Sequence, residues 1–549
     1  MEDKISSHNE GVEPKFETVS GIPIKEIYNS EDIADIDYEG EIADAGTYPF
    51  TRGLFPGMYR NKLWRKRLLS GFGSARDSME RLRYLSSIGA EGVEVVNDSP
   101  SQLGIDADHP MAVEEAGLIG IPVSSLYDLE TILKGFPLDS TVVSFESGGV
   151  SGITIAAQFF ALAEKQDVPL SALNGSIHVN PFDQYYCAYG TLQPLDLWAK
   201  LAVDVVEFSS NQNMKLATFH GSARLARENG INAVQELALG MSSQIAFIDA
   251  MLARGLNFDE FANRPVYTFA IGGDFFEEIA KFRAGRKMWA RIAKERYHAK
   301  NPRATRLYLA VRSSGRVLLA QQPMNNIVRT AYQILAAALG GCNSIDPCLM
   351  DEPLCIPTEN ASWLGMCNQN ILSNETGVPS VADPLGGSYF IEHLTSELEK
   401  RAFEMIQKID EMGGLTEAVK NGWIPSILEE EALKLQRAVE NGTKKQVGLN
   451  EMVIPPEKEQ PIPIHQTSKS STEEQVKRTR EIKEKRDNKN VKELLSKLVG
   501  EDMRGVNLIP TMIEACKEYA SIGEIWGSLR EGRGLTYDPY GMIESPFKD

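Results

Sequence analysis

The chain has 549 residues, a formal net charge of −19 and 42% hydrophobic residues. This length predicts two or more domains, or one large barrel with an appended segment. The acidic balance argues against a nucleic-acid or membrane-surface binder. The N-terminus is polar and no run of eighteen apolar residues occurs, so we expect neither secretion nor a membrane span but a cytoplasmic protein.

The first 45 residues are polar and acidic, and we predict that residues 1–45 form an extended arm over the rest of the chain. The strip that follows, "YPFTRGLFPGMYRNKLWRKRLLSGFG" at residues 48–73, contains six Lys or Arg and no acidic residue. A cationic strip in an acidic chain is typical of a site for one anionic ligand. A solvated surface loop has the same composition, and charge alone does not separate the two interpretations.

Helix and strand patterns alternate between about residues 75 and 400. Residues 77–98, "DSMERLRYLSSIGAEGVEVVND", predict a helix, a glycine-containing turn and a β-branched strand. The same order recurs in residues 124–147, 152–179 and 195–220. One more strand pattern follows in residues 304–315. This alternation predicts a parallel sheet, and we expect a (β/α)8 TIM barrel over residues 46–415. A doubly wound open sheet is the alternative, although no GxGxxG follows a strand.

The strand patterns stop after about residue 400, and we predict a helical extension over residues 416–549. A Pro- and Ser-rich linker, "IPPEKEQPIPIHQTSKSSTEE", interrupts this extension. The last helical segment, "NLIPTMIEACKEYASIGEIWGSLREGRG", has an apolar face. It can dock on the barrel or on a partner chain, or form a cap of its own, and the pattern leaves these alternatives open.

The chain has six cysteines, and none of them forms a CxxC pair. Four of the six, Cys342, Cys348, Cys355 and Cys367, are close in sequence but lack tight metal-ligand spacing. We therefore expect reduced thiols and no metal site.

Several long motifs, in the same order along the chain, resemble the adenosylcobalamin-dependent acyl-CoA mutases of the methylmalonyl-CoA mutase family. These motifs are "YPFTRGLFPGMY", "LGIDADHP", "GGDFFEEIAKFRAGRKMWARI", "NNIVRTAYQILAAALGG" and "DPLGGSYFIEHLT". The resemblance covers most of residues 20–535 and implies an isomerase, an intramolecular transferase that uses radical chemistry. It also implies that the CoA tail threads the barrel axis and that its phosphates meet basic side chains near the barrel mouth.

The family binds cobalamin in a domain marked by the motif DxHxxG, and none of the seven histidines of this chain lies in such a motif. The resemblance therefore implies that a separate small subunit carries most of the adenosylcobalamin site. The C-terminal helices would dock that subunit, and the assembly would be a hetero-oligomer.

The resemblance also assigns residues to the CoA and its acyl group. It implies that Lys62, Arg65 and Arg67 face this ligand and that Phe55 and Met58 form an apolar wall.

Two positions depart from the methylmalonyl-specific members. Leu69 stands where those members have a Tyr, and Ala188 stands near their carboxylate-binding Arg. An aliphatic residue is found at the position of Leu69 in 2-hydroxyisobutyryl-CoA mutases, although the acid of those enzymes aligns with Val96. We therefore expect a branched or hydroxylated acyl-CoA, and not methylmalonyl-CoA.

Three charged or titratable residues replace smaller or neutral family residues at predicted strand ends. Glu146 replaces a small hydroxyl residue, and His178 and Arg312 each replace a Gln. We predict catalytic roles for Glu146 and His178, which could hold a hydroxyl or amino substituent, unless they form a structural pair or face outward. Ser144 and Ser176 belong to the predicted substrate- or CoA-binding set.

The family uses a His in the motif "SGYH" to hydrogen-bond the thioester carbonyl. This chain has "KLATFHGSARLARENG", in which either His220 or Leu225 occupies that place. We favour His220 as the catalytic residue, because it ends a predicted strand.

The leading functional hypothesis is the active large subunit of a split acyl-CoA mutase. The alternative is a catalytically degenerate homologue that acts as the scaffold subunit of a mutase complex. An unrelated barrel lyase or aldolase would need a Schiff-base Lys or metal ligands at strand ends, and we find no convincing set.

Overall fold

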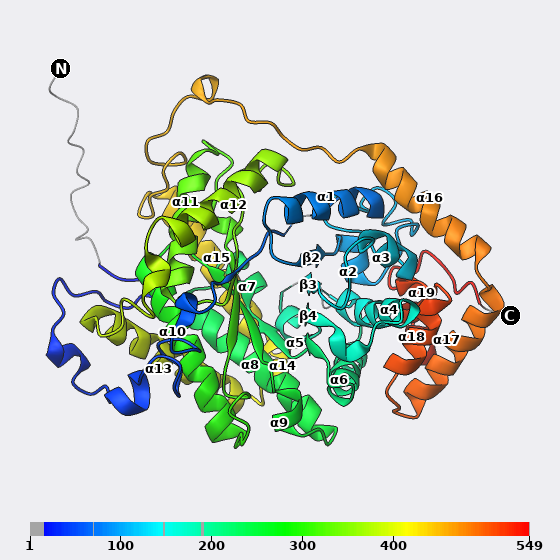
Figure 1. Ribbon diagram of the computed structural model, residues 1–549, viewed down its shortest axis with the longest axis horizontal. Helices are drawn as coiled ribbons and strands as arrows, with labels where there is room; N and C mark the ends of the chain where they lie inside the picture. Colours follow the sequence, from blue (N-terminus) through cyan, green and yellow to red (C-terminus); the bar gives the residue numbers. More distant parts are fainter. Residues whose placement is uncertain (1–15, 70, 147–148, 188–191, 548–549) are drawn as a thin grey trace.

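The computed structural model describes residues 16–69, 71–146, 149–187 and 192–547, and it shows a mixed α/β protein with parallel strands (Figure 1). The strands are β1 Arg65–Lys66, β2 Val93–Val96, β3 Val142–Glu146, β4 Asn174–Ile177, β5 Lys215–Ala217, β6 His220–Ser222, β7 Val266–Ile271, β8 Tyr308–Ser313 and β9 Ser344–Asp346. Every pair of neighbouring strands is parallel. The prediction of a parallel α/β protein is therefore confirmed.

The strands form two sheets, in the orders β1-β9-β8-β7-β6 and β2-β3-β4-β5. At one seam β5 and β6 follow one another in the chain, with only Thr218 and Phe219 between them. At the other seam the Glu91 N–H donates to the Lys66 carbonyl at 2.8 Å, immediately before β2. The two sheets thus meet at both edges, while the strand ladder among the described residues is not continuous around a ring.

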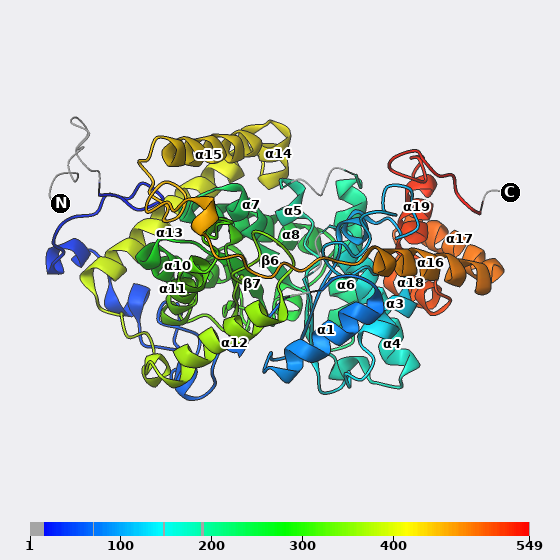
Figure 2. The ribbon, with the colours of Figure 1, turned by 90° about the horizontal axis from the view of Figure 1, so that it is seen from above.

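Helices cover the outer faces of both sheets (Figures 1 and 2). Several begin at side-chain caps, such as the capping boxes of Ser74 before α1 and Asn232 before α8. The α-helices before the Pro- and Ser-rich linker are α1 Ala75–Ser87, α2 Ser99–Leu103, α3 Leu126–Ile132, α4 Ser151–Lys165, α5 Phe182–Tyr185, α6 Leu195–Asn211, α7 Arg224–Asn229, α8 Ala233–Ala253, α9 Phe258–Phe261, α10 Phe275–Arg291, α11 Asn325–Leu339, α12 Glu359–Asn374, α13 Tyr389–Glu411, α14 Leu415–Lys420 and α15 Trp423–Glu440.

Helix α8 is the one helix in the described part of the chain whose length and composition would suffice to cross a membrane. In the most apolar stretch of α8, 72% of the residues are buried inside the protein. The fully buried residues of this helix include Leu237, Met241 and Ile248. This burial is typical of a helix in the core of a packed protein.

The side chains of the strands alternate between the helical layer and an enclosed interior. In β8, Leu309 and Val311 are fully buried against the core, whereas Tyr308, Ala310 and Arg312 lie on the opposite face and keep partial exposure. Because successive side chains of a strand point to opposite faces, the second set lines the interior between the two sheets.

The described part of the N-terminal arm, residues 16–45, lies against the chain's own helices. The Tyr28 ring centroid is 5.0 Å from that of Phe390 in α13, and the Ser20 N–H donates to Glu277 of α10 at 2.9 Å. The remainder of the predicted arm, residues 1–15, lies outside the described residues.

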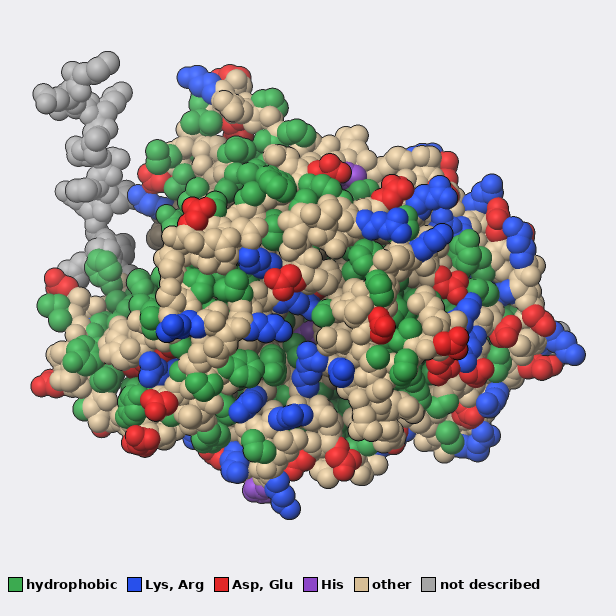
Figure 3. All heavy atoms as spheres, in the orientation of Figure 1, with side chains coloured by type: hydrophobic (Ala, Val, Ile, Leu, Met, Phe, Trp, Pro, Cys, Tyr) green, Lys and Arg blue, Asp and Glu red, His purple; other side chains and the backbone are tan. Residues whose placement is uncertain are grey.

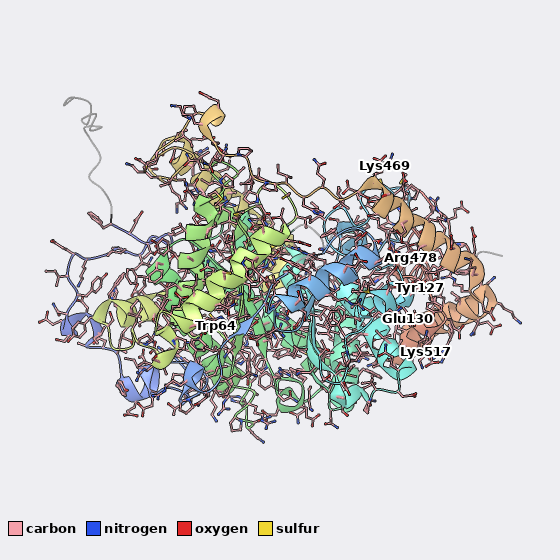
Figure 4. All side chains as sticks on the ribbon, turned by 45° about the horizontal axis from the view of Figure 1, so that its top comes forward. Trp64, Tyr127, Glu130, Lys469, Arg478 and Lys517 are labelled. Atoms are coloured by element: carbon pink, nitrogen blue, oxygen red, sulfur yellow. The ribbon has the colours of Figure 1, made fainter. Side chains whose placement is uncertain are left out.

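The linker after α15 has little regular structure and crosses the molecule from one half to the other (Figures 1 and 2, orange). Four helices follow it: α16 Lys469–Lys485, α17 Asn488–Met503, α18 Ile509–Lys517 and α19 Ile522–Gly532. They pack on the β2–β4 half of the chain. The Trp526 Nε1–H donates to Thr154 Oγ1 at 3.0 Å, and the Arg478 guanidinium lies 5.9 Å from the centre of the Tyr127 ring (Figure 4). The last segment therefore docks on the chain's own α/β body, while the predicted boundary at residue 416 stays a prediction.

Truncation of Trp526 tests this docking. The substitution Trp526→Ala removes a fully buried indole and its hydrogen bond, and we expect the free energy of unfolding to fall by about 3–5 kcal/mol. Chemical denaturation measures the change. The control is Trp363→Ala at a half-exposed indole of α12, for which we expect about 0.5 kcal/mol or less. Equal losses in the two variants would contradict the docking.

Candidate active site

Two arginines and two glutamates meet in the interior at the first three strands. Arg65 of β1 is in contact with Glu94 of β2, and Arg67 Nη2 lies 2.5 Å from a Glu94 oxygen and also contacts Glu146 at the end of β3. Arg65 Nη2 donates to Ser144 Oγ at 3.0 Å. Since β1 and β3 do not pair with each other, these side chains can meet only across the interior. We call Arg65, Arg67, Glu94 and Glu146 the interior ion cluster.

The formal charges of the interior ion cluster sum to zero. Burial outweighs the partners for two members: it lowers the pKa of Arg65 and raises the pKa of Glu94. Burial also acts to raise the pKa of Glu146, but Arg67 together with His220 and His178 lowers that pKa to about 2. Burial acts to lower the pKa of Arg67, but Glu94 and Glu146 raise it above its ordinary value. Arg65 and Arg67 thus lie in the interior with carboxylate partners and are not free cations, while their contact with CoA stays a prediction.

A second ion group lies beside the first, on β8 and β9, and β9 pairs directly with β1. Arg312 of β8 contacts Asp346 of β9 and is 3.1 Å from a Glu352 oxygen. The Asp346 carboxylate also accepts the Leu69 N–H at 3.1 Å. Burial acts to lower the pKa of Arg312, but Asp346 and other neighbours raise it well above the ordinary value.

These two ion groups border a cavity of about 160 Å³, the inner cavity. Many of its walls come from the last residues of strands, so it lies at their carboxyl ends, where barrel active sites are found. An outer cavity of about 920 Å³ adjoins it, and the two share Leu69, Val96, Gln102 and Arg312. The predicted site residues brought together on the inner cavity are Arg67, Leu69, Glu146, His178 and Arg312.

Two histidine rings lie side by side at this site, with centroids 4.7 Å apart. His178 lines the inner cavity. His220 is buried, and its Nε2 is 2.7 Å from Thr268 Oγ1, while its Nδ1 has no hydrogen-bond partner among the described residues. Burial and the neighbouring His178 lower the pKa of His220 to about 3, so the ring is neutral.

The structure shows where the two alternatives for the family's carbonyl-binding His lie. His220 is the first residue of β6, and not the last residue of a strand as expected, while Leu225 lies in α7. Leu225 is on the wall of the inner cavity, and His220 contacts Thr268 and His178, which are also on that wall. Which of the two occupies the family's position stays a prediction.

The other predicted residues lie away from the inner cavity. Lys62 is exposed and Met58 is buried, while Phe55 is half-buried with its ring centroid 6.1 Å from that of Tyr308. On the face shown in Figure 3, several Lys and Arg side chains gather around the middle of the molecule. Ala188, the position matched to a carboxylate-binding Arg, lies outside the described residues.

The sequence interpretation missed two of the acids that neutralise the cations, Glu94 and Asp346. Glu94 interrupts the apolar strand "VEVV", and Asp346 ends the strand "SID". A charge inside an apolar strand is a signal for a paired interior ion, because an unpaired one would be too costly to bury. The described residues contain no group of three or more His, Cys, Asp or Glu placed to hold a metal ion, and all six cysteines are free.

Comparison with known proteins places this site in a family. The family model described as methylmalonyl-CoA mutase matches residues 17–535. The chain therefore belongs to the methylmalonyl-CoA mutase family and is a mutase, an isomerase of a family that depends on adenosylcobalamin.

Two relatives illustrate the range of similarity. The 2-hydroxyisobutanoyl-CoA mutase large subunit of Aquincola tertiaricarbonis is 34% identical over 94% of this chain and 93% of its own length. The mitochondrial methylmalonyl-CoA mutase of Homo sapiens is 31% identical over 94% of this chain and 68% of its own length.

The pKa of Glu146 makes a prediction about stability. Because the folded pKa of about 2 lies below the ordinary 4.5, ionised Glu146 stabilises the folded chain above about pH 5. That stabilisation is lost as the pH falls from about 4.5 to about 2. We expect Glu146→Gln to cost about 3 kcal/mol at pH 7 and progressively less below pH 4.5, as measured by denaturation at each pH.

The control is Glu451→Gln at an exposed pair with Lys445, for which we expect about 0.5 kcal/mol or less. A cost of Glu146→Gln that does not change with pH would show that the carboxylate is not ionised in the folded chain.

The low pKa of His220 predicts a neutral ring. Unfolded chains bind a proton at this position below about pH 6.5 and the folded chain does not, so His220 lowers stability as the pH falls from about 6.5 to about 3. NMR of ¹⁵N-labelled imidazoles, assigned with His220→Asn, should show a neutral His220 from pH 7 down to pH 5. A charged His220 at pH 5 would refute the described environment.

Proposed function

We propose that the chain is the large subunit of a split adenosylcobalamin-dependent acyl-CoA mutase that rearranges a branched or hydroxylated acyl group. The observation that carries this proposal is the charge balance of the inner cavity. Each of the three arginines on its described wall has a carboxylate partner: Arg67 with Glu146, Arg312 with Asp346, and Arg224 with Glu228 at 3.7 Å. The described wall therefore offers no unpaired cation that could bind the free carboxylate of a substrate such as methylmalonyl-CoA.

Similarity to the 2-hydroxyisobutanoyl-CoA mutase large subunit supports the substrate class and the split organisation. That relative and this chain match over 93% and 94% of their lengths. On this basis we also infer that the two sheets form the (β/α)8 barrel of the family, that a small cobalamin-binding subunit completes the enzyme, and that it acts in the cytoplasm.

The wall of the inner cavity suits a small, partly polar acyl group. Leu69 and Val96 offer apolar surface to a branched chain. The ionised Glu146 accepts hydrogen bonds, and His178 lies beside it on the same wall, so the pair can hold a hydroxyl substituent. Burial behind this wall limits the access of water to the reacting group.

The outer cavity fits a cofactor group delivered by another subunit. Its volume of about 920 Å³ is in the range of small-molecule sites, and it opens directly onto the inner cavity. Gln102 and Glu352 supply polar groups on its wall, and Leu354 supplies apolar surface. When bound, adenosylcobalamin supplies a carbon-centred radical by homolysis of its cobalt–carbon bond.

An activity assay tests the proposal. The chain, a small cobalamin-binding chain and adenosylcobalamin are mixed with a panel of acyl-CoA esters, and isomers are measured by mass spectrometry. We expect a branched or hydroxylated ester to be isomerised with a kcat/KM at least about 100-fold above that of methylmalonyl-CoA, since a buried unpaired carboxylate costs several kcal/mol.

In the same assay Glu146→Gln should lower kcat/KM by about 10-fold or more for a hydroxylated ester. The control Glu451→Gln lies on an exposed pair and should leave it unchanged. Preferred turnover of methylmalonyl-CoA would contradict the substrate class.

The interior ion cluster favours a second candidate, a degenerate subunit that acts as a scaffold. Its four side chains fill the interior between β1 and β3, where the resemblance would place the CoA chain. A scaffold would bind its partner chains and raise their activity without turning over any ester of the panel.

A further inference from the structure

The interior ion cluster lies between the inner cavity and a level of the strands where some interior side chains keep partial exposure. On the carboxyl side is the inner cavity, which Arg67 and Glu146 border. Ser176, Ala310 and Ser344 each lie two positions before an interior residue, namely His178, Arg312 and Asp346. They therefore point to the same face of their strands, and they are partly exposed. The side chains of the strands thus remain incompletely covered at this level of the interior.

Arg65 and Glu94 lie at this level of the strands. Arg65 pairs in register with Ser344 on one side and reaches Ser144 of β3 on the other. Glu94 is buried beneath Arg65 and Arg67 and contacts both. The two side chains thus bridge the interior at the level of the partly exposed serines.

Donor atoms at this level lack partners. Arg65 Nε, Arg67 Nε and Ser344 Oγ are buried and have no hydrogen-bond partner among the described residues. Buried donors of this kind are rare, and each is a place where an acceptor atom of a ligand would be favoured. They point to a ligand that lies along the interior, past the interior ion cluster.

We propose that the Arg65–Glu94 pair is an ionic latch that closes the interior and determines which ligands can extend through it. A long thioester such as an acyl-CoA lies along the strands only after Arg65 moves off Glu94 and bonds the ligand instead. A ligand short enough for the inner cavity enters without opening the latch. This inference rests on the proposed function, because it names a specificity-determining pair for the same site.

Binding of free CoA to the full chain tests the latch. The double variant Arg65→Ser/Glu94→Ser removes both latch side chains without changing the net charge. We expect it to bind CoA at least tenfold more tightly than the unmodified chain in isothermal titration calorimetry. The control is Lys477→Ser/Glu481→Ser at an exposed pair on α16, which should leave CoA affinity unchanged. A folded double variant with no gain in affinity would overturn the proposal.

A second variant covers the case in which the double variant does not fold. Glu94→Gln keeps the shape of the side chain but weakens its hold on Arg65, and it should bind CoA more tightly than the unmodified chain, by about threefold or more. Equal or weaker binding would overturn the latch.

These readouts do not depend on turnover. Absence of isomers with every ester would refute the proposed mutase activity while leaving the latch supported by a gain in CoA affinity. Turnover in the assay together with no gain in either variant would refute the latch alone.

Discussion

The pairing of Arg65 and Arg67 with Glu94 and Glu146 is the constraint on which the candidate site depends. Buried ions cost several kcal/mol each unless opposite charges and hydrogen bonds compensate them, and here two cations and two anions cancel. The cluster connects β1 to β2 and β3 through side chains, at an edge where, among the described residues, the backbone hydrogen bond from Glu91 to Lys66 joins the two sheets. Two of its members, Arg67 and Glu146, also form part of the wall of the inner cavity.

The same pairing explains how this chain differs from what its family implies. The methylmalonyl-CoA mutase family is assigned by a match over residues 17–535, but the interior of the strands carries charges at the positions that would face the ligand. Because these charges are mutually neutralised, the site is polar without a net cation. This charge balance is the basis of our proposal that the acyl group carries a hydroxyl or a branch and not a free carboxylate.

The sequence predicted the α/β architecture because helix and strand patterns are local, whereas the candidate site residues Arg67, Glu146, His178 and Arg312 came from the resemblance to the family. Strands β1 and β9 have two and three residues, too few for an alternating pattern. The two acids that pair with Arg67, Glu94 and Glu146, lie 27 and 79 positions away from it in the chain. The order of the strands therefore decides which acid meets which cation. The sequence also placed His220 at the end of a strand, whereas it begins β6, because the break between β5 and β6 has no pattern of its own.

A crystal structure of the full chain with CoA bound tests the central claim most directly. The account predicts that the Arg65–Glu94 contact is broken, with the pantetheine chain passing between these two side chains and Arg65 bonded to the ligand. CoA bound along the interior while Arg65 and Glu94 stay in contact would contradict it.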